Sequence, residues 1–290
     1  MKIGFLGPKG TFTYFACQQS LPLISNNKGA AQLCEYRSID RLFDAYSSHQ
    51  VDAIFLPIEN SIEGPVNRVL DGLLHINGGI SDLFTMPISQ SLLSYQANLD
   101  SAHITDIVSM PHAIAQCHSF IQKNCPKAKL HHSPSTAGSI PLIDALQLPR
   151  STTAIIGHSS ITNYHDDIHI IQKNVHDQKD NCTQFGFIQP NEYQDIKPGP
   201  NRLGLIAFST EKDQPGSLVS ILMIFQSNHI NLTKIVSRPQ RDHVGAYIFY
   251  IEFDIMATTK ETLKTLLFEL KNASNYFKFL GCYEKISIHD

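Results

Sequence analysis

Short apolar segments alternate with amphipathic segments over the first sixty residues. Residues 2–7 and 51–56 are compact apolar runs, which is typical of buried strands, and residues 35–39 fit a third strand. Residues 12–20 and 41–48 have the apolar spacing of helices. The order strand, helix, strand, helix, strand predicts an α/β layer with a mostly parallel sheet.

A second group of strands and helices begins near Leu83. Strands are expected over residues 87–96, 106–110 and 153–156, and a helix is expected over residues 111–123. The pattern therefore predicts a second α/β lobe after the first.

The carboxyl-terminal part has a different order of elements. Residues 190–202 combine prolines with polar side chains and have no apolar periodicity, which is typical of a linker. The pattern after them predicts the ferredoxin-like order βαββαβ. The expected ranges are 202–209, 215–227, 231–237, 245–254, 260–273 and 276–283. We expect one domain over residues 1–190 and another over residues 201–288.

Composition and charge exclude several classes of protein. The 290-residue chain has a net charge of −3 with mixed signs, which gives no electrostatic footprint for nucleic acid. No apolar run approaches the ~20 residues of a membrane-spanning helix, and glycines follow the first strand too early for a signal peptide. The histidines and cysteines have no metal-ligand spacing. We expect a cytoplasmic protein with a small-molecule partner and no metal or membrane.

The densest group of reactive side chains follows the third predicted strand. Glu59, Asn60, Ser61 and Glu63 stand close together there. Ligands of open α/β sheets bind at the carboxyl ends of strands, so the segment predicts a binding site. The alternative is structural, because Ser61 with Glu63 could cap the next helix and Asn60 could stabilise a turn.

The loop after the first strand offers a second candidate. Gly7 and Gly10 have the wrong spacing for a dinucleotide fingerprint or a Walker loop. Backbone N–H groups before the helix at Phe12, with the Thr11 hydroxyl and Lys9 nearby, would attract a carboxylate. A simple turn is the alternative.

Five segments together resemble the prephenate dehydratase family. PIENSIEGPV at residues 57–66 matches the family motif P-I-E-N-S-x-E-G-x-V, and NCTQF at residues 181–185 matches N-x-T-R-F apart from one residue. GPKGTFTYFA at 7–16, GSLVSIL at 216–222 and INLTKIVSRP at 230–239 follow the same family pattern. The resemblance implies a bilobal catalytic domain like that of periplasmic binding proteins, followed by an ACT domain.

The resemblance also implies an activity, the conversion of prephenate to phenylpyruvate, water and carbon dioxide without a cofactor. Thr183 stands where the family has its catalytic threonine, whose hydroxyl can donate to the departing oxygen. Without the resemblance, a threonine that caps a turn would be favoured. The implied substrate-binding residues are Thr11, Asn60, Ser61, Glu63, Gln184 and Phe185. A carboxylate facing the dianionic substrate would repel it, so Glu59 and Glu63 are expected to orient neighbouring donors.

One departure from the family motif changes the charge. Gln184 stands where the family has arginine, which predicts weaker binding of a dianion. Lys9 and Arg68 are the candidates to supply positive charge instead. Three interpretations fit: an active dehydratase of a divergent lineage, which we favour, an enzyme for a related reaction, or a non-catalytic aromatic-amino-acid sensor. The related reactions are prephenate decarboxylation and arogenate dehydration.

The ACT resemblance implies a phenylalanine site. Gly216 lies just before a predicted helix, where a small residue lets an amino-acid carboxylate approach backbone N–H groups. The implied effector residues are Gly216, Ser217, Leu218, Asn231 and Leu232, and such sites commonly form between two chains. We expect a homodimer or homotetramer inhibited by phenylalanine. The alternative is a ferredoxin-like domain that only dimerises.

Overall fold

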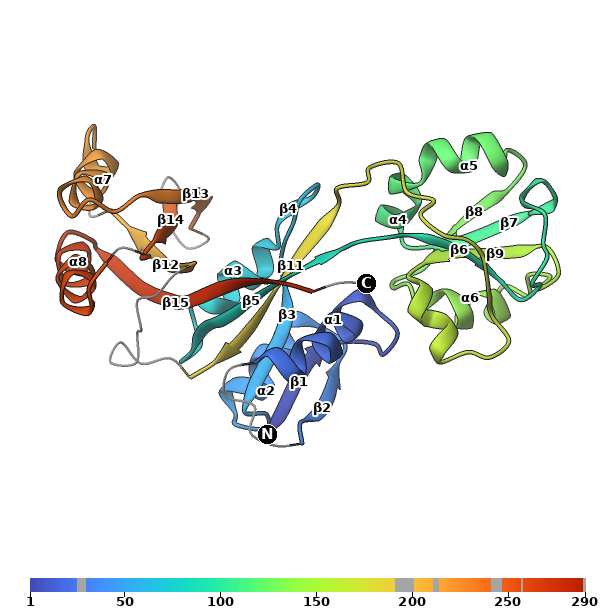
Figure 1. The fold of residues 1–290 in the computed structure, drawn as a ribbon, viewed down its shortest axis with the longest axis horizontal. Helices are drawn as coiled ribbons and strands as arrows, with labels where there is room; N and C mark the ends of the chain where they lie inside the picture. Colours follow the sequence, from blue (N-terminus) through green and yellow to red (C-terminus); the bar gives the residue numbers. More distant parts are fainter. Residues whose placement is uncertain (25–29, 191–200, 211–213, 241–246, 257, 289–290) are drawn as a thin grey trace.

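The chain forms two α/β lobes and a carboxyl-terminal unit, arranged in a row with the first lobe in the middle (Figure 1). The computed structural model describes residues 1–24, 30–190, 201–210, 214–240, 247–256 and 258–288. Most of the linker predicted over residues 190–202 lies outside the described residues, as does the start of the strand predicted over residues 245–254. No helix within the described ranges is long and apolar enough to cross a membrane.

The first lobe is built on a mixed sheet. Strand β1 (Lys2–Leu6) pairs in parallel with β2 (Gln32–Tyr36) and β3 (Ala53–Asn60). Strand β11 (Cys182–Gln189) returns from the second lobe and runs antiparallel between β3 and β5 (Gly79–Pro87). The remaining elements are β4 (Gly64–Pro65), α1 (Phe12–Ser20), η1 (Leu21–Leu23), α2 (Ile39–Ser47) and α3 (Asn67–Leu73).

Local sequence signals explain where these elements begin. The Thr11 hydroxyl accepts a hydrogen bond from the Tyr14 N–H at 3.4 Å and caps α1, and Ser38 caps α2 by accepting from the Arg41 N–H at 3.3 Å. Because Ser38 is a cap, β2 ends at Tyr36, and the predicted strand over residues 35–39 was placed three residues too late. Strands β5 and β11 were not predicted as separate strands.

The second lobe has its own five-stranded sheet, in the order β10-β6-β9-β7-β8. Its helix predicted over residues 111–123 is broken at Cys117, whose backbone dihedral angles leave the helical region. The strand predicted over residues 87–96 is confined to Ser91–Ser94. The elements are β6 (Ser91–Ser94), η2 (Ser101–His103), β7 (Asp106–Ser109), α4 (Pro111–Gln116), α5 (His118–Asn124), β8 (Lys129–His132), α6 (Ser139–Ala145), β9 (Thr153–Gly157), η3 (Ser159–Asn163) and β10 (His169–Gln172).

The carboxyl-terminal unit has the predicted βαββαβ order. Its strands lie in the antiparallel order β13-β14-β12-β15, with the two helices packed on one face. The opposite face packs on the first lobe, where Leu205 and Tyr250 share a core with Ile58 and Leu70. The elements are β12 (Arg202–Ser209), α7 (Ser217–Ser227), β13 (Leu232–Pro239), β14 (Tyr247–Asp254), α8 (Lys260–Asn272) and β15 (Tyr276–Ser287).

Strand β15 joins the sheet of this unit to that of the first lobe (Figure 1). It runs parallel to β5 from Gly281, opposite Ile80, to Ser287, opposite Thr85. Gly281 has φ 141°, and a Cβ on it would lie 2.1 Å from the carbonyl oxygen of Ile80. Only glycine allows this approach of two backbones. The sequence predicted this strand to end at Tyr283, so the shared sheet is a finding of the structure.

Candidate active site

Thr183 and Asn60 lie opposite each other, because the start of β11 pairs with the end of β3. The Asn60 Nδ2 donates to Thr183 Oγ1 at 2.9 Å, to Asn181 Oδ1 at 2.8 Å and to the Cys182 carbonyl oxygen at 3.1 Å. The structure thus brings together the two motifs that the sequence places more than a hundred residues apart.

The orientation of the Asn60 amide is fixed by its other end. Its Oδ1 accepts hydrogen bonds from the backbone N–H groups of Ile62 at 2.9 Å and Glu63 at 3.0 Å. Because the oxygen is held by two N–H donors, the nitrogen must face Thr183. The structural alternative for Asn60 is therefore correct as well, since the same side chain stabilises a turn and holds the threonine hydroxyl.

Ser61 and Asn181 complete this network. The Ser61 N–H donates to the Cys182 carbonyl at 2.9 Å, and its hydroxyl accepts from the Cys182 N–H at 3.0 Å. Asn181 is 2% exposed, and its Nδ2 has no hydrogen-bond partner within the described residues. Sequence reasoning did not select Asn181 as a site residue, although it opens the N-x-T-R-F motif.

The Thr183 hydroxyl retains one hydrogen-bonding function. The side chain is 8% exposed and accepts from Asn60, while no described residue accepts the hydroxyl proton. A hydroxyl oxygen that already accepts an N–H bond can still donate its own proton. The site therefore holds a positioned donor with no acceptor in the protein.

Thr11 lies at the same edge of the sheet, after β1. Its Oγ1 donates to the Pro8 carbonyl at 2.9 Å and accepts from Tyr14, so both functions of the hydroxyl are used within the loop. The loop lies close to the second lobe, because a Cβ on Gly10 would lie 3.6 Å from that of Ala137. The Lys9 N–H donates to Glu35 at 3.1 Å.

Glu63 contacts the second lobe instead of orienting Asn60 or Ser61. Its carboxylate lies 3.3 Å from Nδ1 of His112 at the start of α4, and both side chains are about half exposed or more. Only the backbone N–H of Glu63 binds Asn60. The expectation that the Glu63 carboxylate orients neighbouring donors is therefore wrong.

Gln184 and Phe185 lie away from the Thr183 hydroxyl. Phe185 is 1% exposed and stacks on Phe55 with ring centroids 5.6 Å apart, so it is a core residue. Gln184 lines a cavity of about 30 Å³ on the face of the sheet that packs on the carboxyl-terminal unit, together with Lys234 and Glu252. Successive side chains of a strand point to opposite faces, which explains why Gln184 and Thr183 separate.

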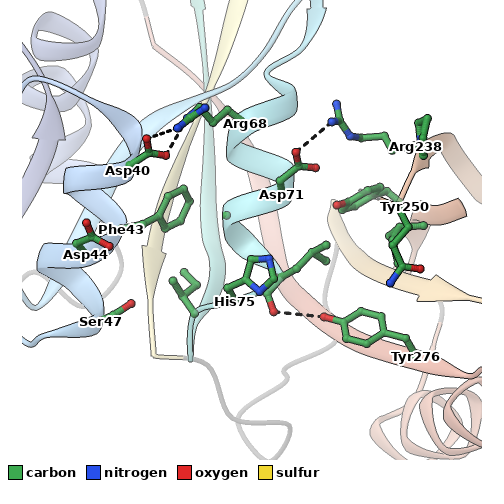
Figure 2. Close-up of a pocket in the computed structure, with 16 residues that line it drawn as sticks. Asp40, Phe43, Asp44, Ser47, Arg68, Asp71, His75, Arg238, Tyr250 and Tyr276 are labelled. Atoms are coloured by element: carbon green, nitrogen blue, oxygen red, sulfur yellow. Dashed lines mark hydrogen bonds and ion pairs between the residues drawn. The ribbon is translucent and has the colours of Figure 1, made fainter. Parts of the chain in front are cut away.

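A larger cavity of about 550 Å³ lies between helices α2 and α3 and strands β13 and β14 (Figure 2). Arg68 pairs with Asp40 on one side of it, and Arg238 pairs with Asp71 at 3.1 Å on the other. Neither Thr183 nor any of the six implied substrate-binding residues lines this cavity. Arg68 is therefore engaged with Asp40 and does not supply charge beside Thr183.

The predicted effector residues lie at two ends of one helix. Gly216 precedes α7 with φ 91°, and no described atom would lie within 4 Å of a Cβ on it; Ser217 and Leu218 form the first turn. Asn231 and Leu232 follow the other end of this eleven-residue helix, about 16 Å away at 1.5 Å per residue. One small ligand cannot touch both ends within a single chain.

Known proteins match this chain over nearly its whole length. The prephenate dehydratase family model matches residues 3–193, and the ACT domain model matches residues 205–271. A prephenate dehydratase of Methanocaldococcus jannaschii is 31% identical, with 95% of each chain covered. One of Bacillus subtilis is 28% identical over 99% of this chain and all of the relative.

A solved structure has the same overall arrangement. It is a prephenate dehydratase from Arthrobacter aurescens in complex with L-Phe, 27% identical, with a TM-score of 0.83, covering 98% of this chain and 90% of the relative. The predicted α/β fold class, two lobes followed by an ACT domain, is confirmed. The chain belongs to the prephenate dehydratase family.

Proposed function

We propose that this chain converts prephenate to phenylpyruvate, carbon dioxide and water, with Thr183 as the catalytic residue. The observation that carries the proposal is the Thr183 hydroxyl, which accepts a hydrogen bond from Asn60 at 2.9 Å and has no acceptor for its own proton within the described residues. Membership of the family supports the choice of substrate.

The reaction needs one positioned proton donor. The bond between the ring and the ring carboxylate breaks, carbon dioxide leaves, and the electron pair enters the ring as the opposite C–O bond breaks. Thr183 donates its proton to the departing oxygen, which leaves as water, and solvent returns a proton to Thr183. One proton is consumed per turnover. Positioning in a protein site typically gives such donors a 10²- to 10⁴-fold effect.

The substrate carboxylates need donors that carry no negative charge. The Ser61 hydroxyl, whose contact with Asn181 Oδ1 is long at 3.5 Å, and the N-terminal N–H groups of α1 beside Thr11 are uncharged donors at the same sheet edge, whereas the amide protons of Asn60 are used within the network. A helix N-terminus favours anions through its partial positive charge. We assign one carboxylate of prephenate to this edge, with Gln184 and Phe185 outside direct contact.

We further propose inhibition by phenylalanine at a site shared by two ACT domains. The ACT match and the separation of Gly216 from Asn231 along α7 support a site that takes residues from two chains. Exposed apolar side chains on α7 and the edge strand β13, Val219 at 55%, Met223 at 59% and Ile235 at 47%, support a homodimer or homotetramer. The domain limits, 1–190 and 201–288, and the cytoplasmic location are kept as predictions.

The test is phenylpyruvate formation from prephenate at neutral pH, followed by the absorbance of phenylpyruvate in alkali. A control without protein is essential because prephenate aromatises spontaneously in acid. Turnover supports the dehydratase. Release of carbon dioxide without phenylpyruvate would point to decarboxylation alone, preference for arogenate would change the substrate, and no reaction by folded protein would leave a sensor of aromatic amino acids.

A further inference from the structure

The two faces of β11 carry different functions. Thr183 belongs to the active-site network with Asn60, whereas Gln184 faces a small cavity shared with the ACT domain. Five other polar residues line this cavity: Glu59, Lys234, Tyr250, Glu252 and Tyr283. Strand β11, which carries the Thr183 hydroxyl, is therefore also part of the surface that contacts the ACT domain.

Two carboxylates and two ammonium groups meet at this surface. Glu252 accepts hydrogen bonds from Thr233 at 2.6 Å, Tyr283 at 2.8 Å and Lys285 at 3.0 Å, all within the ACT domain. Glu59 of β3 pairs with Lys234 of β13, and this pair crosses from the catalytic lobe to the ACT domain. The two side chains are 24% and 34% exposed, so the pair is partly shielded from water.

Glu59 is one residue from the side chain that holds Thr183. In the pairing of β3 with β11, Glu59 lies opposite Gln184 and Asn60 lies opposite Thr183. The ion pair with Lys234 holds Glu59, the residue before Asn60. The backbone N–H groups of Ile62 and Glu63, which follow Asn60, hold its side-chain oxygen. Asn60 is thus held between two anchors.

We propose that Lys234 of the ACT domain is a positioning residue for the Thr183 hydroxyl and acts through Glu59. This inference rests on the proposed dehydration of prephenate for its kinetic test. Lys234 touches neither the hydroxyl nor the Asn60 amide, and its ammonium group holds the strand end in the position from which Asn60 donates to Thr183.

The chain offers a matched control. Arg238 lies on the same strand β13, four positions along, and pairs with Asp71 of α3 at 3.1 Å. This pair also joins the ACT domain to the first lobe, but it ends on a helix that does not contact Thr183 in the network described above. Loss of Arg238 therefore shows how much activity falls when the contact between the ACT domain and the first lobe is weakened without a change at Glu59.

The kinetic test compares Lys234→Met, Lys234→Arg and Arg238→Met in the full-length protein. We expect Lys234→Met to lower kcat about fivefold, or about 1 kcal/mol at 1.36 kcal/mol per tenfold, with KM for prephenate within about twofold. Lys234→Arg is expected to restore most of kcat, and Arg238→Met to stay within about twofold of the parent. Equal losses in Lys234→Met and Arg238→Met, or no loss in Lys234→Met, would overturn the proposal.

A readout independent of the substrate is amide hydrogen exchange. Lys234→Met should speed exchange in residues 57–66, whereas Arg238→Met should speed exchange in residues 67–74 and leave 57–66 unchanged. Should the parent show no turnover of prephenate, the proposed function fails and exchange alone decides the positioning role. Unchanged exchange of residues 57–66 in Lys234→Met would overturn that role.

Discussion

The first lobe has two neighbours, and it is joined to them in different ways. On one side its sheet continues into the ACT domain through β15 and β5, and Lys234 and Arg238 add ion pairs. On the other side, two connecting segments lead to a separate sheet (Figure 1). The contacts there are side-chain contacts, such as the rings of Phe12 and Phe15 at 4.8 and 4.7 Å from that of His158.

This difference predicts that the contact with the ACT domain is fixed and that the contact with the second lobe can rearrange. Backbone pairing between strands breaks only when several hydrogen bonds are lost together, whereas ring contacts and exposed ion pairs rearrange at low cost. We expect the two lobes to open and close for substrate while the first lobe and the ACT domain move as one body. A signal from the ACT domain would then reach Thr183 through β3 and β11.

The largest predicted effect is on the shared sheet. Gly281→Val would place side-chain carbon against the backbone of Ile80, where even a Cβ would lie 2.1 Å from the carbonyl oxygen. We expect a loss of about 3 kcal/mol in the free energy of unfolding, measured in urea. A loss below about 1 kcal/mol would show that β15 and β5 do not pair in solution. Ser220→Ala on α7 serves as a surface control.

The pH dependence of the stability of the ACT domain tests whether the buried Glu252 carboxylate is ionised. Burial of Glu252 opposes its ionisation, but hydrogen bonds from Thr233, Lys285 and Tyr283 and the charge of Lys285 outweigh it, so its pKa is lowered. A lowered pKa adds stability that is complete above the ordinary carboxyl pKa of about 4.3 and is lost as the pH falls through the folded value.

Glu252→Gln is therefore expected to cost about 2 kcal/mol at pH 6 and progressively less below pH 4. Urea unfolding of both proteins at several pH values measures this difference. A cost that stays constant from pH 6 to pH 3 would contradict the ionised state of Glu252 in the folded protein.

A smaller effect is predicted for a substitution at position 184, where the family has arginine. Gln184 faces the ACT domain, so Gln184→Ala, which removes the amide without adding a charge beside Glu59 and Lys234, should leave kcat and KM for prephenate within about twofold of the parent. A change of tenfold or more in KM would mean that position 184 reaches the substrate, as the sequence interpretation expected.

The smallest predicted effect is at the contact between the two lobes. The pair between Glu63 and His112 is exposed and joins the two lobes, so Glu63→Gln should change the free energy of unfolding by less than about 0.5 kcal/mol. A loss above 1 kcal/mol would show that this contact holds the lobes together and would weaken the contrast between the two neighbours.

The sequence predicted the order of most elements, because apolar periodicity and caps are local signals. The motif positions also predicted that Asn60 and Thr183 belong to one site. Alternation along a strand could have placed Gln184 on the face opposite Thr183, but the segment was not recognised as a strand. The pairing of Gly281 with Ile80 joins residues two hundred positions apart, and no local pattern encodes it.

The central claim is that the Thr183 hydroxyl donates a proton to the oxygen leaving prephenate. Its most direct test is the rate of phenylpyruvate formation by Thr183→Ala, with Thr265→Ala on the exposed face of α8 as the control. The account predicts a loss of kcat of about a hundredfold in protein that still folds, with a cost of about 1 kcal/mol in the free energy of unfolding for the lost hydrogen bond from Asn60. Near-parental turnover by folded Thr183→Ala would contradict the account.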